Sequence, residues 1–288
     1  MILEGGSFAN LKRSLIILII IIILAILLIG LFGEVDRLIR FFWGVEEGVS
    51  YYGEDLSGYL DSEVRDFLLY YSKELMLYPV NAYIDKSNGE IIAEVEGEIL
   101  DIGETMKKIF NAEDGEKVEG VRCVLKPWLT KKDIENISYK VGSYNTTIRG
   151  SEGRRRNIEI ATKAINNILL LSGETFSFNR VVGPRTKEAG FAEAPEVVDG
   201  ELTKGVGGGI CQVSSTLYNA LEVEGLEVVE RHAHSKDVGY VPKGKDATVA
   251  WDYFDLKFKN NLSSPIIIKA KVVDDKLVVE VLGKEEDY

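Results

Sequence analysis

Cysteine and histidine are scarce in this chain, with two of each among 288 residues. Two cysteines exclude a disulfide-rich scaffold and any four-thiolate metal site. Two histidines leave little material for a histidine-built zinc site. Proline is also rare, at six residues, and together with 28 glycines it stays below the share typical of a disordered chain. We therefore expect a folded protein with no metal and no cofactor.

Basic residues are outnumbered by acidic ones, 34 to 46, which gives a net charge of -12. Because affinity for phosphate comes mainly from clustered cations, this balance argues against a nucleic-acid-binding protein. The hydrophobic share of 45% is enough for a packed core, and the mean hydropathy is zero. That average hides two unlike parts of the chain.

The first part is a membrane segment. Residues 14–33 contain no charged side chain and are nearly all isoleucine and leucine. As a helix they span about 30 Å, the thickness of the hydrocarbon core of a bilayer. Lys12 and Arg13 precede the segment, so the positive-inside bias predicts a cytoplasmic N-terminus (residues 1–13) and an extracytoplasmic body. A cleaved signal peptide would have a shorter apolar region ending in small residues, so we expect a single-pass anchor.

The second part is a strongly acidic body. Without Glu4, Lys12 and Arg13, the chain from Glu34 onward carries 32 basic and 45 acidic residues, a net charge of -13. Anionic lipid headgroups repel such a surface. We therefore expect the anchor, and not surface charge, to hold the body at the membrane.

The body is predicted to be α+β throughout. Residues 34–48 are amphipathic and aromatic, as in a juxtamembrane stalk. Residues 49–137 combine one helical pattern with short alternating runs, which indicates a small α+β domain. Residues 138–288 predict a second, strand-rich α+β domain with helices after residue 154 and over 211–224. Its expected strands are 139–148, 176–182, 194–198, 226–231, 246–258 and a hairpin over 265–282.

The most unusual string leads from a glycine-rich turn into the helix that carries Cys211. Three successive glycines precede Ile210, and Cys211 falls in the first helical turn. The partial positive charge of a helix N-terminus favours the thiolate, which is the reactive form of cysteine. N–H groups of Gly208 and Gly209 can stabilise an oxyanion. A structural turn capping an ordinary helix with a buried cysteine explains the same pattern, and the spacing does not decide between the two.

Both histidines lie close together at the end of a predicted strand. Alternation along that strand places His232 and His234 on one face. A thiolate nucleophile needs a nearby imidazole as base and later as acid, so this pairing favours the catalytic interpretation. Metal binding by the pair lacks a convincing third ligand. Four carboxylates are candidates to orient the imidazole, and their spacing does not choose among them: Asp237, Asp246, Asp252 and Asp255.

The other cysteine follows a different pattern. Cys123 alternates in phase with Val121 and Leu125, so we expect it to face a core from a strand. A disulfide with Cys211 is the alternative outside the membrane, but it would consume the one well-placed nucleophile.

Two arginines flank the turn Gly183-Pro184. Arg180 and Arg185 can clamp a substrate carboxylate from this position. The alternative is that both are solvated surface residues.

Residues through most of 138–283 resemble the VanW family. The matching strings are Arg156-Asn157-Ile158, Gly173-Glu174-x-Phe176-Ser177-Phe178-Asn179, Val182-Gly183-Pro184-Arg185-Thr186, Gly207-Gly208-Gly209-Ile210-Cys211-Gln212-Val213-Ser214-Ser215-Thr216-Leu217-Tyr218-Asn219, Glu230-Arg231-His232-x-His234-Ser235, Tyr240-Val241-Pro242-x-Gly244-x-Asp246-Ala247-Thr248-Val249 and Asp255-Leu256-x-Phe258-x-Asn260. Residues 49–137 resemble, more loosely, the peptidoglycan-binding domain that often precedes this one.

The resemblance implies a membrane-anchored cell-envelope cysteine acyltransferase that cross-links peptidoglycan stem peptides as an L,D-transpeptidase does. In that role Cys211 is the nucleophile, His234 the base and Asp246 the residue that orients the base. The candidate substrate-binding residues are Gly208, Gly209, Arg185, His232, Ser214 and Tyr240. The alternatives are a non-catalytic envelope-binding module and a cysteine peptidase that hydrolyses stem peptides.

Overall fold

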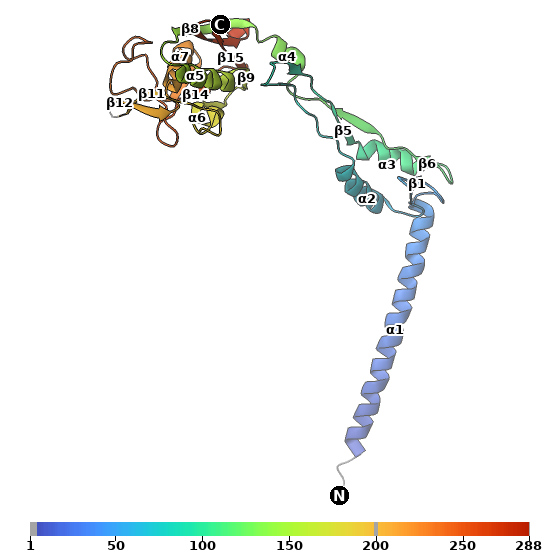
Figure 1. The fold of residues 1–288 in the computed structure, drawn as a ribbon. Helices are drawn as coiled ribbons and strands as arrows, with labels where there is room; N and C mark the ends of the chain where they lie inside the picture. The colour runs from blue at the N-terminus through green and yellow to red at the C-terminus, as the bar shows by residue number, and fades with distance from the viewer. Residues whose placement is uncertain (1–4, 199–200, 288) are drawn as a thin grey trace. The chain divides into compact units, whose positions relative to one another are not determined.

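The computed structural model describes residues 5–198 and 201–287 and shows a mixed α+β chain behind a long N-terminal helix (Figure 1), as the sequence predicted. The chain forms two compact units. Unit 1 comprises Met1–Pro79 and Glu96–Lys126, and unit 2 comprises Val80–Val95 and Pro127–Tyr288. The chain therefore passes between the units three times. The domain boundary expected after residue 137 stays a prediction, and these units divide the chain differently.

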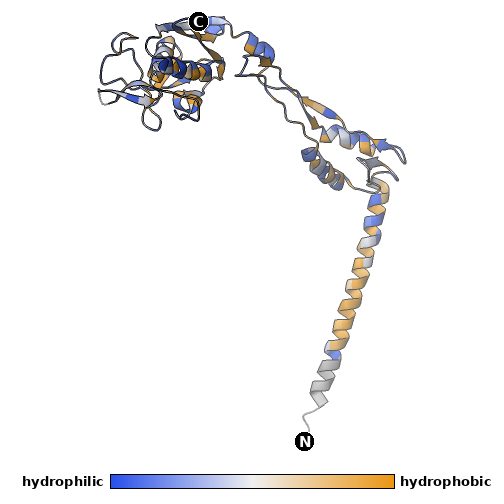
Figure 2. Ribbon diagram, viewed as in Figure 1, coloured by the Kyte–Doolittle hydropathy of each residue, from blue (hydrophilic) through white to orange (hydrophobic). Residues whose placement is uncertain are grey.

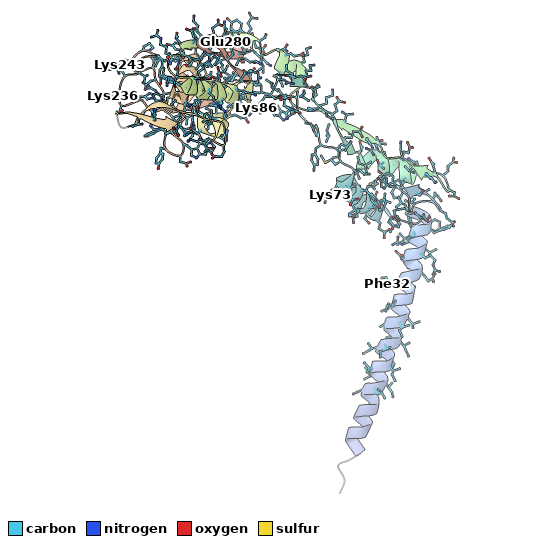
Figure 3. The ribbon with its side chains drawn as sticks, viewed as in Figure 1. Phe32, Lys73, Lys86, Lys236, Lys243 and Glu280 are labelled. Carbon is cyan, nitrogen blue, oxygen red and sulfur yellow. The ribbon has the colours of Figure 1, made fainter. Side chains whose placement is uncertain are left out.

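The membrane segment lies within helix α1, Gly5–Trp43. Its stretch Arg13–Trp43 is long and apolar enough to cross a membrane, and its side chains are exposed along the whole span. Figure 2 shows the apolar colour along the middle of α1, with hydrophilic residues near its C-terminal end, and Figure 3 shows the side chain of Phe32, 71% exposed, standing away from the helix. Because α1 continues without a break to Trp43, most of the expected stalk is helical. Arg40, near its end, forms a bidentate pair with Glu63.

The rest of unit 1 is a small α+β body. Its core is formed by side chains that are fully buried, among them Leu56, Val64, Leu68 and Ile109. The elements are β1 (Ser50–Tyr51), β2 (Glu54–Asp55), α2 (Asp61–Glu74), β5 (Gly97–Leu100), α3 (Ile102–Phe110), β6 (Lys117–Val118) and β7 (Arg122–Leu125).

The expectation that Cys123 faces a core is wrong. Strand β7 pairs only with β5 in a two-stranded ribbon, and Cys123 is exposed on it. Alternation marks one face of a strand, but here the Cys123 side chain on that face is exposed. The Cys123 thiol instead donates to Asp101 Oδ2 at 3.5 Å, and both cysteines of the chain are free.

Unit 2 is built around an antiparallel sheet in the order β8 (Tyr139–Thr147), β16 (Lys276–Gly283), β15 (Ile266–Val273) and β9 (Ile168–Leu170). The expected hairpin is confirmed, because β15 and β16 pair across a two-residue turn. One face carries α5 (Glu152–Ile165) and α7 (Ile210–Ala220), with α5 on β15 and α7 on β8 and β16. The other face carries the hairpin of β3 (Tyr83–Ile84) and β4 (Ile91–Ile92) with α4 (Lys131–Glu135).

A second sheet in unit 2 has the order β10 (Thr175–Ser177), β14 (Lys257–Asn260) and β13 (Leu226–Glu230). A separate hairpin of β11 (Glu193–Val198) and β12 (Glu201–Val206) leads directly into the glycines before α7.

Two expected strands are shorter than the sequence suggested. The run over 176–182 ends at Ser177, whose hydroxyl accepts the Arg180 N–H and starts the short helix α6 (Phe178–Val182). The run over 246–258 is irregular as far as Leu256, with only isolated bridges. Some backbone N–H groups in this run donate to side chains, as Asp255 N does to Glu230 Oε1. These groups are therefore hydrogen-bonded without the pairing of a regular β-strand.

Candidate functional site

The site is built at the first turn of α7. Gly207 and Gly209 have φ of +103° and +107°, a backbone conformation that favours glycine. Ile210 N donates to Gly207 O at 3.2 Å and Gln212 N to Gly209 O at 3.0 Å. Within the residues the structure describes, the N–H of Cys211 between them has no backbone acceptor. It is one of the unpaired donors that every helix N-terminus leaves, and it is free to bind an anion.

Gly208 is required for a steric reason. A Cβ at this position would lie 2.6 Å from Pro195 O and 2.8 Å from Ala194 O, both backbone atoms of β11. The amide of Asn157, which is fully buried on α5, donates to Gly208 O at 3.0 Å. Close packing of β11, α5 and the turn thus fixes where α7 begins.

The Cys211 thiol lies half-buried between α7 and the irregular segment after residue 246. Its Sγ is 3.5 Å from Val249 O, to which it donates. The ring of His234 lies near the thiol, because Cys211 is among the groups that raise the pKa of the imidazole. The structure therefore brings together the cysteine and one of the two histidines that the sequence singled out.

Asp246 holds His234 by two hydrogen bonds. Its Oδ2 lies 2.6 Å from both the backbone N and the ring Nδ1 of His234. The side chains are 9% and 14% exposed, so the pair is nearly shielded from water. With Nδ1 bonded to Asp246, Nε2 is the ring nitrogen left for the thiol. Of the four carboxylates that sequence reasoning left open, Asp246 occupies the orienting position.

The pKa shifts follow from these contacts. Burial by itself lowers the pKa of His234, but the hydrogen bond to Cys211, its charge, and the Asp246 carboxylate outweigh burial and raise that pKa above its ordinary value of 6.5. Burial by itself raises the pKa of Asp246, but hydrogen bonds from the His234 backbone and ring lower it overall. Both shifts stabilise an imidazolium beside an ionised carboxylate.

These shifts predict how stability depends on pH. Because the pKa of His234 is higher in the folded than in the unfolded protein, its contribution is complete below about pH 6.5 and is lost as the pH rises through the folded value. The stability advantage of the wild type over His234→Gln is therefore expected to shrink above that pH. Urea unfolding of the full chain in detergent micelles, at several pH values from 6 to 9, measures it. An advantage that stays constant across this range would contradict the assignment.

Two serines on α7 hydrogen-bond to Ala247, next to Asp246, and so hold the segment that contacts His234 against the helix. Ser215 Oγ donates to Cys211 O at 2.6 Å and accepts from Ala247 N at 2.9 Å. Ser214, predicted to bind substrate, is fully buried and donates to Ala247 O at 2.6 Å. Its hydroxyl is thus used for positioning and does not face a ligand.

Arg231 is a supporting residue that sequence reasoning missed. Its Nε donates to Asp246 O at 2.6 Å and its Nη2 lies 3.3 Å from Asp246 Oδ1. The guanidinium also stacks on Tyr218, 4.8 Å from the ring centroid. The signal was present, because Arg231 stands directly before the histidine pair.

The two histidines have different partners. Strand β13 ends at Glu230, and His232 Nε2 lies 3.1 Å from Glu230 Oε1 while its ring packs on Phe254. Among the described contacts, none joins His232 to Cys211. The sequence predicted that both histidines lie on one face of a strand. In the structure only the ring of His234, and not that of His232, lies at the thiol.

Two further candidates do lie near the thiol. Tyr240 is half-buried and follows Lys236 and precedes Lys243, which Figure 3 labels. Burial raises the pKa of Tyr240 well above its ordinary value, and the Cys211 charge adds to the rise, so the phenol stays protonated. Arg185 also senses the Cys211 charge, although burial lowers its pKa overall.

No metal-binding group stands out in the part of the chain that the structure describes. Over 5–198 and 201–287, no three His, Cys, Asp or Glu side chains are grouped so that they could hold a metal ion.

Comparisons with known proteins identify the family. The family model described as VanW like protein matches residues 153–282. The chain is 39% identical over 212 residues to the uncharacterized protein YoaR of Bacillus subtilis, covering 72% of this chain and 70% of that one. It is 31% identical over 140 residues to the vancomycin B-type resistance protein VanW of Enterococcus faecalis, covering 47% of this chain and 51% of that one. No solved structure matches. The chain therefore belongs to the VanW family.

Proposed function

We propose that this protein is a membrane-anchored cysteine acyltransferase of the cell envelope that cross-links peptidoglycan stem peptides in the manner of an L,D-transpeptidase. The observation that carries the proposal is the hydrogen bond between His234 and Asp246 beside Cys211 at the start of α7, where the thiol also raises the pKa of His234. A nucleophile, a base and a group that orients the base are the parts that acyl transfer through a thioester needs. The name of the enterococcal relative, a vancomycin resistance protein, is consistent with work in the envelope.

In the acylation step, the Cys211 thiolate attacks the carbonyl carbon of the third stem residue. The oxyanion that forms accepts hydrogen bonds from the unpaired backbone N–H of Cys211 and from the backbone N–H of Gly209. His234, protonated in the pair, donates its proton to the leaving nitrogen, the C–N bond breaks, and the terminal D-alanine departs. The product is a thioester on Cys211.

In the transfer step, a side-chain amine of a neighbouring stem attacks the thioester carbonyl. His234, now neutral, takes a proton from the attacking amine, and the C–S bond breaks to restore the thiolate. Asp246 holds the ring in one tautomer throughout, because Nδ1 remains bonded to its carboxylate. A water molecule in place of the amine would give hydrolysis.

The membrane topology suits this substrate. Lys12 and Arg13 precede the apolar part of α1, so we place the N-terminus in the cytoplasm and both units on the outer side. The loose resemblance of 49–137 to a peptidoglycan-binding domain suggests that this segment retains the polymer.

The test is an assay of the full chain in detergent micelles with muropeptides that carry four-residue stems. We expect D-alanine release and a new cross-linked dimer by mass spectrometry, both abolished in Cys211→Ala. The matched control is Cys123→Ala, which should keep full activity because this exposed cysteine lies in unit 1. D-alanine release without a dimer would mean a peptidase, and muropeptide binding without release would mean a binding module. Either result would overturn the proposal.

A further inference from the structure

Arg185 is held in place beside the site by three neighbours. It follows the turn after α6, and its Nη2 donates to Asn179 Oδ1 at 2.6 Å. Its guanidinium carbon lies 5.8 Å from the ring centroid of Phe178 and 5.7 Å from that of Trp251. Stacking on two rings and a fixed hydrogen bond leave the planar group little freedom.

One donor of this guanidinium is unused. Nη1 is shielded from water and has no hydrogen-bond acceptor among the described residues. Arg185 also forms no ion pair in that part of the chain. The carboxylate whose charge reaches it is Asp255, but Asp255 already accepts from Ser177 Oγ, Asn179 N and Leu256 N. A cationic N–H group that is shielded from water and has no acceptor is costly unless a ligand supplies one.

The stem of Arg185 lies against the turn that leads into Cys211. A Cβ on Gly207 would come within 3.2 Å of Arg185 Cβ, so the arginine stem packs against the turn that begins α7. The charge of Cys211 acts directly on Arg185. Asn179 and Trp251, which both contact Arg185, also line a cleft of about 350 Å³, although Arg185 itself is not among its lining residues. Trp251 is 38% exposed and precedes Asp252, which has φ of +66°.

We propose that Arg185 binds the free α-carboxylate of the residue that is released from the donor peptide. Nη1 donates to the carboxylate while Nη2 stays on Asn179. Cys211 then acts on donors that end one residue after the bond to be broken, because a longer peptide has no charged group at that distance. The inference deepens the proposed acyl transfer and rests on it.

The test compares a four-residue stem peptide that has a free C-terminus with the same peptide as its C-terminal amide. For the full chain in micelles we expect kcat/KM to be about 10²-fold lower for the amide, the size of effect typical for losing one partner of a buried charge pair. In Arg185→Gln the ratio of kcat/KM for the free acid to kcat/KM for the amide should fall to nearly one, because kcat/KM for the free acid falls. Arg185→Lys keeps the charge without the fork of donors and should give an intermediate ratio.

A binding measurement separates this inference from the transfer chemistry. In Cys211→Ala, calorimetric titration should show the acid binding about 10²-fold more tightly than the amide, and Arg185→Gln in that background should remove the difference. Equal affinities would overturn the assignment of Arg185 even if transfer occurs. A difference that disappears in Arg180→Gln and survives in Arg185→Gln would also overturn it. If binding discriminates but the wild type forms no product, the proposed transfer fails and the carboxylate site stands.

Discussion

Replacing Asp246 by asparagine is expected to slow acylation of Cys211 by the donor peptide about 10³- to 10⁴-fold. The carboxylate fixes the tautomer of His234 by accepting from Nδ1, and its charge stabilises the imidazolium. The asparagine side chain has the same shape but no charge. Its amide can also place an N–H donor against Nδ1 of His234, which must itself donate. Quenched-flow mass spectrometry of the thioester on the full chain measures the rate.

The matched control for this substitution is Asp237→Asn. Asp237 lies on the same loop, is 67% exposed, and pairs only loosely with Lys243 at 3.5 Å. Its substitution should leave the acylation rate within about twofold, since exposed ion pairs contribute little. If Asp246→Asn lowers the acylation rate by less than about tenfold, His234 is oriented without the carboxylate.

Replacing Phe258 by alanine should lower the free energy of unfolding of unit 2 by about 3 to 5 kcal/mol. Phe258 lies on the central strand of the second sheet and is fully buried. Its ring stacks on that of Phe176, with centroids 4.8 Å apart. The same sheet includes β13, which leads into the histidine segment, so the loss should also loosen the site. Pulse proteolysis of the full chain in a urea series, followed by the protease-resistant fragment that contains Pro127–Tyr288, measures the effect.

Tyr253→Ala provides the comparison for Phe258→Ala. Tyr253 is also aromatic and lies in unit 2, but it is 82% exposed, so its removal should change stability by no more than about 0.5 kcal/mol. Similar losses for both variants would mean that the Phe176–Phe258 pair is not part of the folding core.

The parts of the site that the sequence could predict are those set by local chemistry. Three glycines before a helical pattern placed Cys211 in the first turn of α7, and the pairing of the two histidines pointed to His234. Asp246 was one of four candidates, because an aspartate twelve residues away contacts a histidine only if the intervening loop folds back. Here Arg231 and Ser215 hold that loop, through contacts between segments that spacing does not reveal.

Other predictions needed knowledge of what covers each face. Cys123 alternates with apolar neighbours, but its position in a two-stranded ribbon leaves its side chain exposed. Ser214 and Ser215 are adjacent and chemically alike, and only the position of Ala247 shows that both are used for positioning. Arg185 was a candidate from its turn, whereas the shortage of an acceptor at Nη1 is visible only once every neighbouring carboxylate has been placed.

The three passages of the chain between the units have a consequence for biosynthesis. Unit 1 is complete once Lys126 has been made, so it can fold while most of unit 2 does not yet exist. Ile84 and Ile91, however, belong to a cluster with Ile267 in unit 2. At ribosomal speeds of about 5–20 residues per second, their hairpin waits roughly 9 to 35 seconds for that partner. During this interval it can pack only against members of the cluster that have already been made, such as Leu129 and Ile134.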